Sequence, residues 1–322
     1  DIMATIFVEG PMHARGMELL SLRDDLDVRL EQGLTPDSLA AAIKDADAVI
    51  LRLTPLTAQA IAGAANLKIV SRLGVGYDHV DVAALSGRGI PLAIVGDALA
   101  ASVAEHTVLL MLGLSRQIAV MDRYTRTGRY AERFKSQTHE LLDKSVLIIG
   151  LGGIGGEAAK RCAAFGMRVV ACGREATRKE AQRLGYDYVA DFHDALGDVD
   201  FVSLHLPAND EGTPLLGTAE FSAMKPGAYV INTARGSLID EDALHAALTS
   251  GHLGGAGLDV TKDEPPKDDC PLLALDNVLF TPHNSALTVE TGRRVAETAV
   301  RNALAGLDGD LDPAFVVNKD VL

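Results

Sequence analysis

Cysteine is scarce in this sequence of 322 residues, and tryptophan is absent. The three cysteines are Cys162, Cys172 and Cys270, and no two of them have C-x-x-C spacing. A small, odd number of cysteines in a long chain is typical of proteins from the reducing cytoplasm. We therefore expect a cytoplasmic protein, and we expect no metal site.

Positive charge is also in short supply. The chain has 30 lysine and arginine residues against 44 aspartate and glutamate residues, so its formal net charge is −14. Such a chain does not favour extended polyanions, so we expect neither a nucleic acid nor a membrane surface as its partner. Single arginines can still bind a small anionic substrate.

Long apolar runs, repeats and low-complexity tracts are not evident either. No apolar run is expected to approach the roughly 18 residues that span a membrane, and no signal peptide is expected. The composition of 48% apolar and 23% charged residues is ordinary for a globular protein with a full core. At roughly 100–200 residues per domain, the length predicts about two domains.

The first hundred residues alternate between β-favouring and helical segments. This alternation predicts a parallel sheet with helices on both of its faces. The expected strands are Ala4–Glu9, Asp27–Leu30, Ala48–Leu51 and Leu67–Ser71, and the expected helices run to Leu20, over Thr35–Ala46 and over Thr57–Ala64.

A glycine-rich turn organises the next part of the chain. The apolar run Val146–Ile149 leads into a G-x-G-x-x-G turn made by Gly150, Gly152 and Gly155, and an alanine-rich helical stretch follows to Gly166. These glycines permit a tight turn, let the backbone approach phosphates and let the helix pack closely on the strand. The helix N-terminus also attracts an anion. The stretch therefore predicts a dinucleotide-binding site.

The alternation continues on both sides of this turn. Two long helices are expected over Ala100–Met121 and Val289–Leu304, and Asp122–Ser136 is expected to be a loop or an irregular crossing. The other expected elements are strands at Arg168–Cys172, Asp200–Leu204, Ala228–Asn232, Gly255–Val260 and Asn277–Thr281, and helices at Thr177–Leu184 and Asp240–Ser250.

Polar residues follow several of these strands. In chain order they are His205, Arg235, Glu264 and His283. Ligands of parallel sheets bind at the carboxyl ends of the strands, so we expect these side chains to meet there. An arginine binds a carboxylate, a histidine donates a proton near neutral pH, and a carboxylate orients that histidine. This set predicts the reduction of a 2-oxo acid by a nicotinamide cofactor.

Five motifs follow one another along nearly the whole chain. They are RLGVGYDHVD, GLGGIG, NTARGSLIDEDAL, GLDVTKDEPP and TPHNSALT. In this order they resemble the D-isomer-specific 2-hydroxyacid dehydrogenase family, which includes phosphoglycerate dehydrogenases and glyoxylate/hydroxypyruvate reductases. The resemblance implies an α/β fold of two doubly wound parallel-sheet domains. A Rossmann-type dinucleotide-binding domain at 99–286 would be inserted in a flavodoxin-like substrate-binding domain at 1–98 and 287–322.

The same resemblance implies roles for individual residues. The catalytic set is Arg235, Glu264 and His283, and the helix that begins at Ala100 forms much of a homodimer interface. The expected cofactor-binding residues are Gly150, Gly152, Gly153, Ile154, Gly155, Gly173, Arg174, His205, Thr233, Ala234, Arg235, Asp259 and His283. For His205 the alternative is that it merely ends a strand.

The substrate is expected to contact residues from both domains. By resemblance, the backbone of Val75 and Gly76 binds the substrate carboxylate, and Arg235 and His283 are further substrate-binding residues. Arg52 follows a strand of the first domain and is the candidate for the far end of the substrate.

Position 173 departs from the family, because many members carry a cofactor-selecting aspartate there. Gly173 lies 18 residues after Gly155, where an acid would bind the ribose 2′-OH and select NAD. Without that carboxylate, and with Arg174 directly after it, a 2′-phosphate is attracted rather than repelled. We therefore expect NADP(H) to be preferred, with NAD(H) as the second candidate.

Two further departures leave the substrate open. The segment Thr127–Tyr130 lacks the tryptophan common in the family, and Asn284 and Ser285 replace the usual residues after His283. Both positions lie near the expected side group of the substrate. Glyoxylate, hydroxypyruvate, phosphohydroxypyruvate and sulfopyruvate all stay open.

Other functions are weighed against this one. A dinucleotide-sensing corepressor of the same fold would act through partner contacts, but the three catalytic residues favour an enzyme. A formate dehydrogenase pairs its histidine with glutamine, whereas this chain has Glu264. His106 beside Glu105 could suggest a metal pair, but one helical turn supplies no third ligand, which favours a structural histidine.

Overall fold

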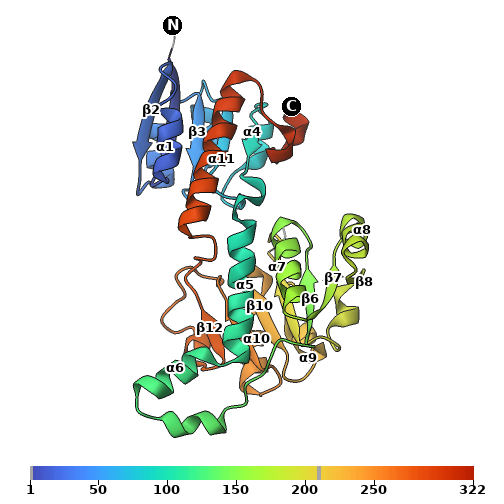
Figure 1. Ribbon diagram of the computed structural model, residues 1–322. Helices are drawn as coiled ribbons and strands as arrows, with labels where there is room; N and C mark the ends of the chain where they lie inside the picture. Colours follow the sequence, from blue (N-terminus) through green and yellow to red (C-terminus); the bar gives the residue numbers. More distant parts are fainter. Residues whose placement is uncertain (1–2, 209–211) are drawn as a thin grey trace. The chain divides into compact units, whose positions relative to one another are not determined.

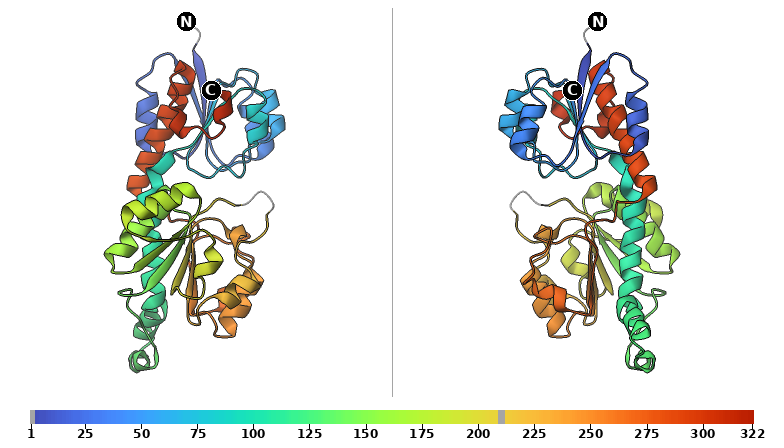
Figure 2. Two further views of the ribbon diagram at one scale, coloured as in Figure 1. Left: turned by 90° about the vertical axis from the view of Figure 1, so that its right-hand side faces the viewer. Right: turned by 90° about the vertical axis from the view of Figure 1, so that its left-hand side faces the viewer.

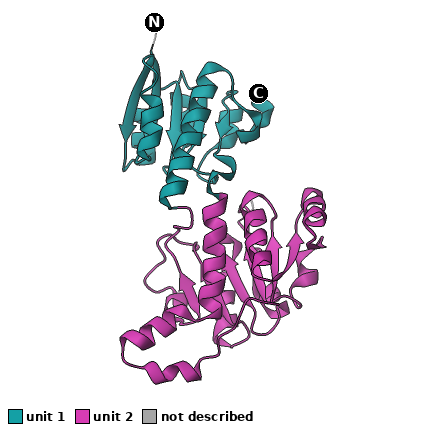
Figure 3. Cartoon of the chain, in the orientation of Figure 1, with its two compact units in different colours: residues 1–99, 287–322 teal, residues 100–286 magenta. Residues whose placement is uncertain are grey.

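The computed structural model describes residues 3–208 and 212–322 (Figure 1). The chain forms two compact units: unit 1 is Asp1–Leu99 with Leu287–Leu322, and unit 2 is Ala100–Ala286 (Figure 3). Each unit contains one parallel sheet covered by helices, which confirms the predicted fold class. The assignment of the substrate to unit 1 and of the dinucleotide to unit 2 stays a prediction.

Unit 1 is built on a parallel sheet in the order β2-β1-β3-β4-β5, which is the order of flavodoxin-like folds. Figure 2 shows α1 and α11 on one face of this sheet and α2, α3 and α4 on the other. The elements are β1 (Ala4–Glu9), α1 (Ala14–Leu20), β2 (Leu26–Glu31), α2 (Pro36–Ala42), β3 (Ala48–Leu51), α3 (Ala58–Gly63), β4 (Ile69–Arg72), α4 (Val82–Ser86), β5 (Leu92–Ala93) and α11 (Val289–Asp308).

Successive side chains along each strand point to opposite faces of this sheet. Val70 lies in the core beneath α2, α3 and α4. Its neighbour Ser71 points the other way, and its hydroxyl donates to the carbonyl oxygen of Ala299 in α11 at 2.7 Å. The last long helix of the chain therefore completes the core of unit 1.

Unit 2 is built on a parallel sheet in the order β12-β11-β10-β9-β6-β7-β8. The order reverses between β6 and β9, and ligands of such sheets bind outside the carboxyl ends of the strands at this point. The strands are β6 (Ser145–Ile149), β7 (Arg168–Cys172), β8 (Asp187–Val189), β9 (Phe201–Leu204), β10 (Tyr229–Asn232), β11 (Gly255–Leu258) and β12 (Val278–Phe280).

Helices cover both faces of the unit 2 sheet. Helices α5 (Ala100–Ser115), α7 (Gly153–Ala164) and α8 (Glu175–Leu184) lie on one face, and α9 (Thr218–Ala223) and α10 (Glu241–Thr249) lie on the other. In β6, Val146 and Ile148 pack into the core on the α5 side, whereas Leu147 and Ile149 pack into the core on the α10 side. Burial on both faces explains why this strand is apolar throughout.

Two expectations for the middle of the chain are wrong. The helix expected over Ala100–Met121 ends at Ser115, because Gln117 adopts a left-handed conformation with φ of 50°. A separate helix, α6 (Ile118–Arg126), follows it. The loop expected over Asp122–Ser136 therefore contains the end of α6 and a 3-10 helix, η2. The 3-10 helices are η1 (Gly96–Leu99), η2 (Tyr130–Lys135), η3 (Phe192–Ala195), η4 (Gly236–Leu238), η5 (Pro271–Ala274), η6 (Pro313–Phe315) and η7 (Lys319–Val321).

The expectation that no apolar run is long enough to span a membrane is also wrong. Gly96–Ser115 is a helical stretch of 20 residues with a mean hydropathy of 1.5. By length and composition alone, it is long and apolar enough to cross a membrane. Of its apolar window, 67% is buried inside the protein, and α5 packs on α7, β10 and β11. A core position therefore accounts for the apolar composition of this helix.

Candidate active site

The glycine-rich turn joins β6 to α7 at the reversal point of the unit 2 sheet. Gly150 has φ of +96°, and Gly152 is the N-cap residue of α7. A Cβ atom on Gly155 would overlap the carbonyl oxygen of Gly150, so only glycine fits there. Among the described residues, no side chain caps the helix. Its first N–H groups therefore suit a pyrophosphate.

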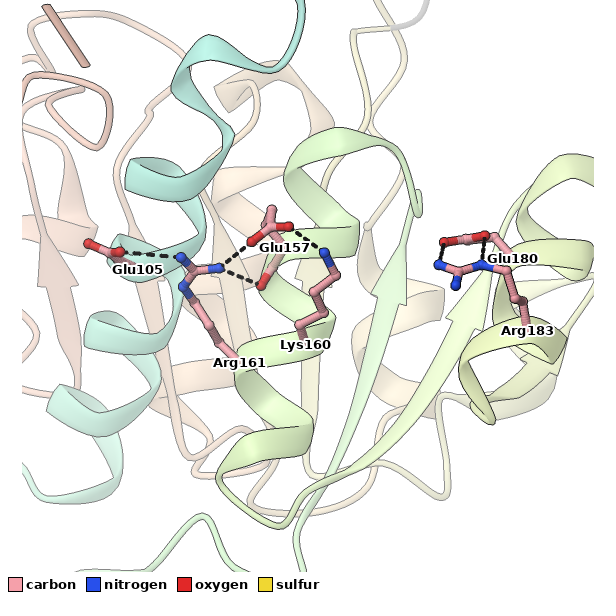
Figure 4. A network of polar contacts seen from close by, with 6 residues as sticks. All are labelled: Glu105, Glu157, Lys160, Arg161, Glu180 and Arg183. Atoms are coloured by element: carbon pink, nitrogen blue, oxygen red, sulfur yellow. Dashed lines mark hydrogen bonds and ion pairs between the residues drawn. The ribbon is translucent and has the colours of Figure 1, made fainter. Parts of the chain in front are cut away.

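Helix α7 is tied to α5 by a cluster of charged side chains (Figure 4). Arg161 of α7 lies 2.7 Å from Glu157 of the same helix and 3.2 Å from Glu105 of α5. Lys160 completes the cluster, at 2.6 Å from Glu157. Such partly exposed pairs contribute at most about 1 kcal/mol each. The cluster therefore orients the two helices more than it stabilises them.

His205 follows β9, directly beside the glycine-rich turn. Its Nε2 lies 2.9 Å from the Ser203 hydroxyl, and its Nδ1 is buried without a hydrogen-bond partner among the described residues. Burial lowers the pKa of His205 to about 4, so the ring is neutral at pH 7. A neutral, partly buried histidine therefore lies against Gly150 and Gly155 of the turn. Contact with the cofactor stays a prediction.

The end of β7 is where a cofactor ribose is expected. Gly173 follows the strand, and a Cβ atom on it would lie 2.5 Å from the hydroxyl oxygen of Thr177. Arg174 is exposed at the start of α8. Arg178 forms two hydrogen bonds to Glu175, at 2.8 and 2.6 Å, so its charge is largely neutralised. Arg174 is therefore the main candidate for contact with a 2′-phosphate.

Arg235 lies in the turn between β10 and η4. Asn232, the last residue of β10, is fully buried, and its amide donates to the carbonyl oxygen of Arg235 at 2.8 Å. Its side-chain oxygen accepts from the N–H of Ala234 at 3.0 Å. A Cβ atom on Gly236 would overlap the backbone of Thr261. The turn that carries Arg235 therefore packs directly against the loop after β11.

Glu264 and His283 form a direct pair, as the sequence predicts. Nδ1 of His283 donates to Oε2 of Glu264 at 2.7 Å, and Glu264 Oε1 lies 3.3 Å from the N–H of Thr261. The side chain of His283 is 52% exposed and that of Glu264 is 39% exposed. His283 has φ of +49°, a left-handed conformation that is uncommon outside glycine.

Asp259 is buried next to the loop that carries His283. Its carboxylate accepts hydrogen bonds from the Thr281 hydroxyl at 2.6 Å and from the N–H groups of Asn284 and Ser285 at 3.0 and 3.1 Å. Burial alone would raise the pKa of Asp259, but these hydrogen bonds outweigh it and leave the pKa below its usual value. Asp259 is therefore ionised and holds the loop around His283. Contact between Asp259 and the cofactor stays a prediction.

A pocket of about 370 Å³ borders the Glu264–His283 pair. Arg235 is not among its lining residues. The structure therefore joins the acid and the histidine directly, whereas Arg235 is linked to them through the contact of its turn with Thr261. The lining residues are Asp259, Thr261, Glu264, Pro265, Pro266, Leu273, Phe280, Thr281, Pro282 and His283.

The predicted substrate residues of unit 1 lie at the carboxyl end of its own sheet. Arg52 follows β3, and its N–H donates to the buried carboxylate of Glu9 at 2.6 Å. Val75 and Gly76 follow β4, and Nε of the buried Arg72 donates to the carbonyl oxygen of Gly76 at 2.6 Å. Glu9 and Arg72 were missed from the sequence, although each is a charged residue that ends a buried strand.

Three comparisons with known proteins bear on this site. Residues 108–285 match the family model described as "D-isomer specific 2-hydroxyacid dehydrogenase, NAD binding domain". A glyoxylate reductase of Korarchaeum cryptofilum is 33% identical and covers 98% of this chain and 96% of its own. A solved structure of a glyoxylate reductase from Paecilomyes thermophila has a TM-score of 0.89 at 29% identity, and the match covers 98% of this chain and 99% of that chain.

The chain also resembles part of a longer protein. A D-3-phosphoglycerate dehydrogenase of Methanocaldococcus jannaschii is 37% identical over 311 residues, which cover 96% of this chain but 58% of that protein. The chain thus spans little more than half the length of this relative.

Proposed function

The chain belongs to the D-isomer-specific 2-hydroxyacid dehydrogenase family, and we propose that it reduces a small 2-oxo acid to a 2-hydroxy acid. A bound nicotinamide cofactor would supply the hydride. Arg235 binds the substrate carboxylate with its planar guanidinium and polarises the adjacent carbonyl. His283 donates a proton to the carbonyl oxygen as it gains negative charge. Glu264 orients the imidazole of His283 for that step.

The observation that carries this proposal is the hydrogen bond between His283 and Glu264. A carboxylate oxygen only accepts, so Nδ1 of His283 carries a proton and donates it to Oε2 at 2.7 Å. This leaves Nε2 as the atom that faces a reactant.

NADP(H) is the proposed preference within a nicotinamide site of the family's NAD-binding domain. Gly173 has no carboxylate to repel a 2′-phosphate, and Arg174 is exposed beside it. The bidentate hydrogen bond from Arg178 to Glu175 largely neutralises the charge of this nearby arginine, so the preference rests on Arg174. A difference of about 1.4 kcal/mol between the binding free energies of NADPH and NADH corresponds to about tenfold in affinity.

Glyoxylate and hydroxypyruvate are the proposed first substrates, because relatives that match over nearly their whole length are named glyoxylate reductase and hydroxypyruvate reductase. Phosphohydroxypyruvate is the next, because phosphoglycerate dehydrogenases match over about half of their length. Arg52 is the side chain proposed to contact a distal anionic group.

A cytoplasmic homodimer is part of the same proposal. The three cysteines are unpaired, which suits a reducing compartment. Large apolar side chains are exposed along the segment from α5 to η2, as expected for a surface that a second copy covers. They are Leu109, Ile118, Tyr130 and Phe134. Light scattering at several concentrations measures the mass, and a monomer at all of them contradicts this part.

A panel of 2-oxo acids, assayed with NADPH and with NADH, tests the activity. The panel contains glyoxylate, hydroxypyruvate, phosphohydroxypyruvate and sulfopyruvate, with formate and NAD(P)⁺ as the test of the rival dehydrogenase. We expect oxidation of NADPH with at least one 2-oxo acid, and no reduction of NAD(P)⁺ with formate. If no 2-oxo acid is reduced while the cofactor still binds, the dinucleotide-sensing alternative is favoured instead.

A further inference from the structure

The catalytic loop, residues 281–285, carries His283 in a conformation that needs support. A left-handed backbone is unfavourable for a non-glycine residue, and His283 has φ of +49°. Its side chain is 52% exposed, so packing of the ring does not hold it in place. Besides the hydrogen bond to Glu264, support for this conformation comes from contacts made by the rest of the loop.

One face of α5 supplies such contacts to both ends of the loop. Ser102 donates from its hydroxyl to the carbonyl oxygen of Ser285 at 2.6 Å. Nε2 of His106 lies 2.8 Å from the hydroxyl oxygen of Thr281. Ser102 and His106 are four residues apart in a helix, so their side chains lie on the same face. The loop is thus attached to α5 on either side of His283.

The direction of each hydrogen bond in this network follows from the chemistry of its members. The Asp259 carboxylate accepts only, so the single proton of the Thr281 hydroxyl points to Asp259, at 2.6 Å. The remaining lone pairs of Thr281 then accept the proton of His106 Nε2. His106, Thr281 and Asp259 therefore form one chain with a fixed order of donors. Asp259 ends it by binding the N–H groups of Asn284 and Ser285.

The same stretch of α5 also contacts the predicted cofactor side of unit 2. Glu105 lies 3.2 Å from Arg161 of α7 (Figure 4), and the hydroxyl of Thr107 lies 3.2 Å from that of Thr233. Three consecutive residues of α5 therefore reach the helix after the glycine-rich turn, the catalytic loop and the turn that carries Arg235. This distribution of contacts accounts for His106 without a metal ion.

We propose that Ser102 and His106 are positioning residues for the proton donor: they hold the catalytic loop at Ser285 and Thr281 and so aim His283 at the substrate. This inference rests on the proposed function, because His283 is the group that they aim. His106 acts through Thr281 and Asp259, and no contact of His106 with substrate or cofactor is required.

Substitutions at both ends of the His106–Thr281 hydrogen bond test the proposal. His106→Leu and Thr281→Val remove the bond, whereas His106→Gln and Thr281→Ser keep a donor and a hydroxyl. We expect the first pair to lower kcat by about 10- to 100-fold, because small misplacement of a reacting group is costly. Cofactor affinity should change less than about threefold, and the second pair should recover most of kcat. The double variant His106→Leu with Thr281→Val should be no slower than the slower single variant.

His252→Leu is the matched control. His252 is also half-buried in unit 2, and its Nε2 donates to the carbonyl oxygen of Met224 at 3.0 Å. It precedes β11 and so lies at the amino ends of the strands, whereas the catalytic loop lies at their carboxyl ends. We expect it to lower the melting temperature without changing kcat. An equal loss of kcat in this control, or additive losses in the double variant, would overturn the proposal.

An NMR measurement without substrate tests this inference separately from the proposed function. In protein labelled with ¹⁵N-histidine, the His283 ring signals are identified by their loss in His283→Asn. They should shift in His106→Leu and Thr281→Val and stay in place in His252→Leu. Unchanged His283 signals in the first two variants contradict the positioning role. A wild-type protein that reduces no 2-oxo acid contradicts the proposed function, and the signals still decide the positioning.

Discussion

Nδ1 of His283 and Oε2 of Glu264 lie 2.7 Å apart, although the two residues belong to different loops of unit 2. Both side chains are partly exposed, so water weakens this hydrogen bond in the free protein. Substrate and cofactor would exclude that water and strengthen the interaction. The effect of Glu264 should therefore be larger in turnover than in the stability of the free protein.

Removal of the proton donor is the first prediction. His283→Ala should lower kcat by about 10²–10⁴-fold, because general acid catalysis typically contributes that much. Cofactor affinity, measured by fluorescence titration, should stay within a few-fold of wild type. His139→Ala, at an exposed histidine, is the control and should keep full activity. Wild-type turnover in His283→Ala would require another acid.

We predict that a lysine cannot replace Arg235. Arg235→Ala should abolish measurable reduction, and Arg235→Lys should recover little of it, because a lysine ammonium cannot bind a carboxylate through two parallel hydrogen bonds. Steady-state kinetics at saturating cofactor measure the effect, with the exposed Arg116→Ala as control. A lysine variant close to wild type would show that charge alone suffices there.

Turnover is predicted to depend on Glu264 as the residue that orients His283. Glu264→Ala removes the acceptor that lies 2.7 Å from Nδ1 of His283, so the imidazole loses the contact that orients it. We expect kcat to fall by about 10- to 100-fold, because small misplacement of a reacting group is costly. Glu264→Gln keeps an acceptor oxygen and should recover part of kcat, measured by steady-state kinetics at saturating cofactor. A Glu264→Ala variant with wild-type kcat would show that the carboxylate does not position His283 in turnover.

Cofactor preference is predicted to reverse with three substitutions. Wild type should prefer NADPH, and Gly173→Asp with Arg174→Ala introduces the carboxylate that favours NADH. A Cβ atom at position 173 would lie 2.5 Å from the Thr177 hydroxyl oxygen, so Thr177→Ala is added to make room. We expect a change in the NADPH/NADH ratio of kcat/KM of roughly tenfold or more. Thr177→Ala alone is the control and should keep the wild-type preference; a wild type that prefers NADH would refute the idea.

Glu9 is predicted to stabilise unit 1 only above acidic pH. Burial would raise the pKa of Glu9, but hydrogen bonds from Thr54, Arg52 and Leu53 outweigh it and leave the pKa below its usual value of 4.5. A lowered folded-state pKa stabilises above the unfolded value, and this contribution is lost as pH falls through the folded value. Glu9→Gln should therefore lower the melting temperature by a few degrees at pH 7, with a difference that shrinks below about pH 4. The exposed Glu31→Gln should show no such pattern.

Strand positions could be predicted because parallel strands buried on both faces are short, continuous apolar runs. Ala48–Leu51 and Arg168–Cys172 agree with the structure to the residue. The end of α5 could not be predicted in the same way. The apolar pattern runs on past Ser115, and the left-handed conformation of Gln117 that ends the helix has no glycine or proline to signal it.

The sequence alone determined which catalytic side chains exist and that Glu264 and His283 meet, because all strands of a parallel sheet end at the same edge. What holds them there was decided by the tertiary structure. Ser102 contacts Ser285 across 183 residues of sequence, and His106 contacts Thr281 across 175. No local pattern encodes such pairs, since each depends on how α5 packs against the sheet. The buried charge of Asp259 is likewise stable only because the folded loop surrounds it with hydrogen-bond donors.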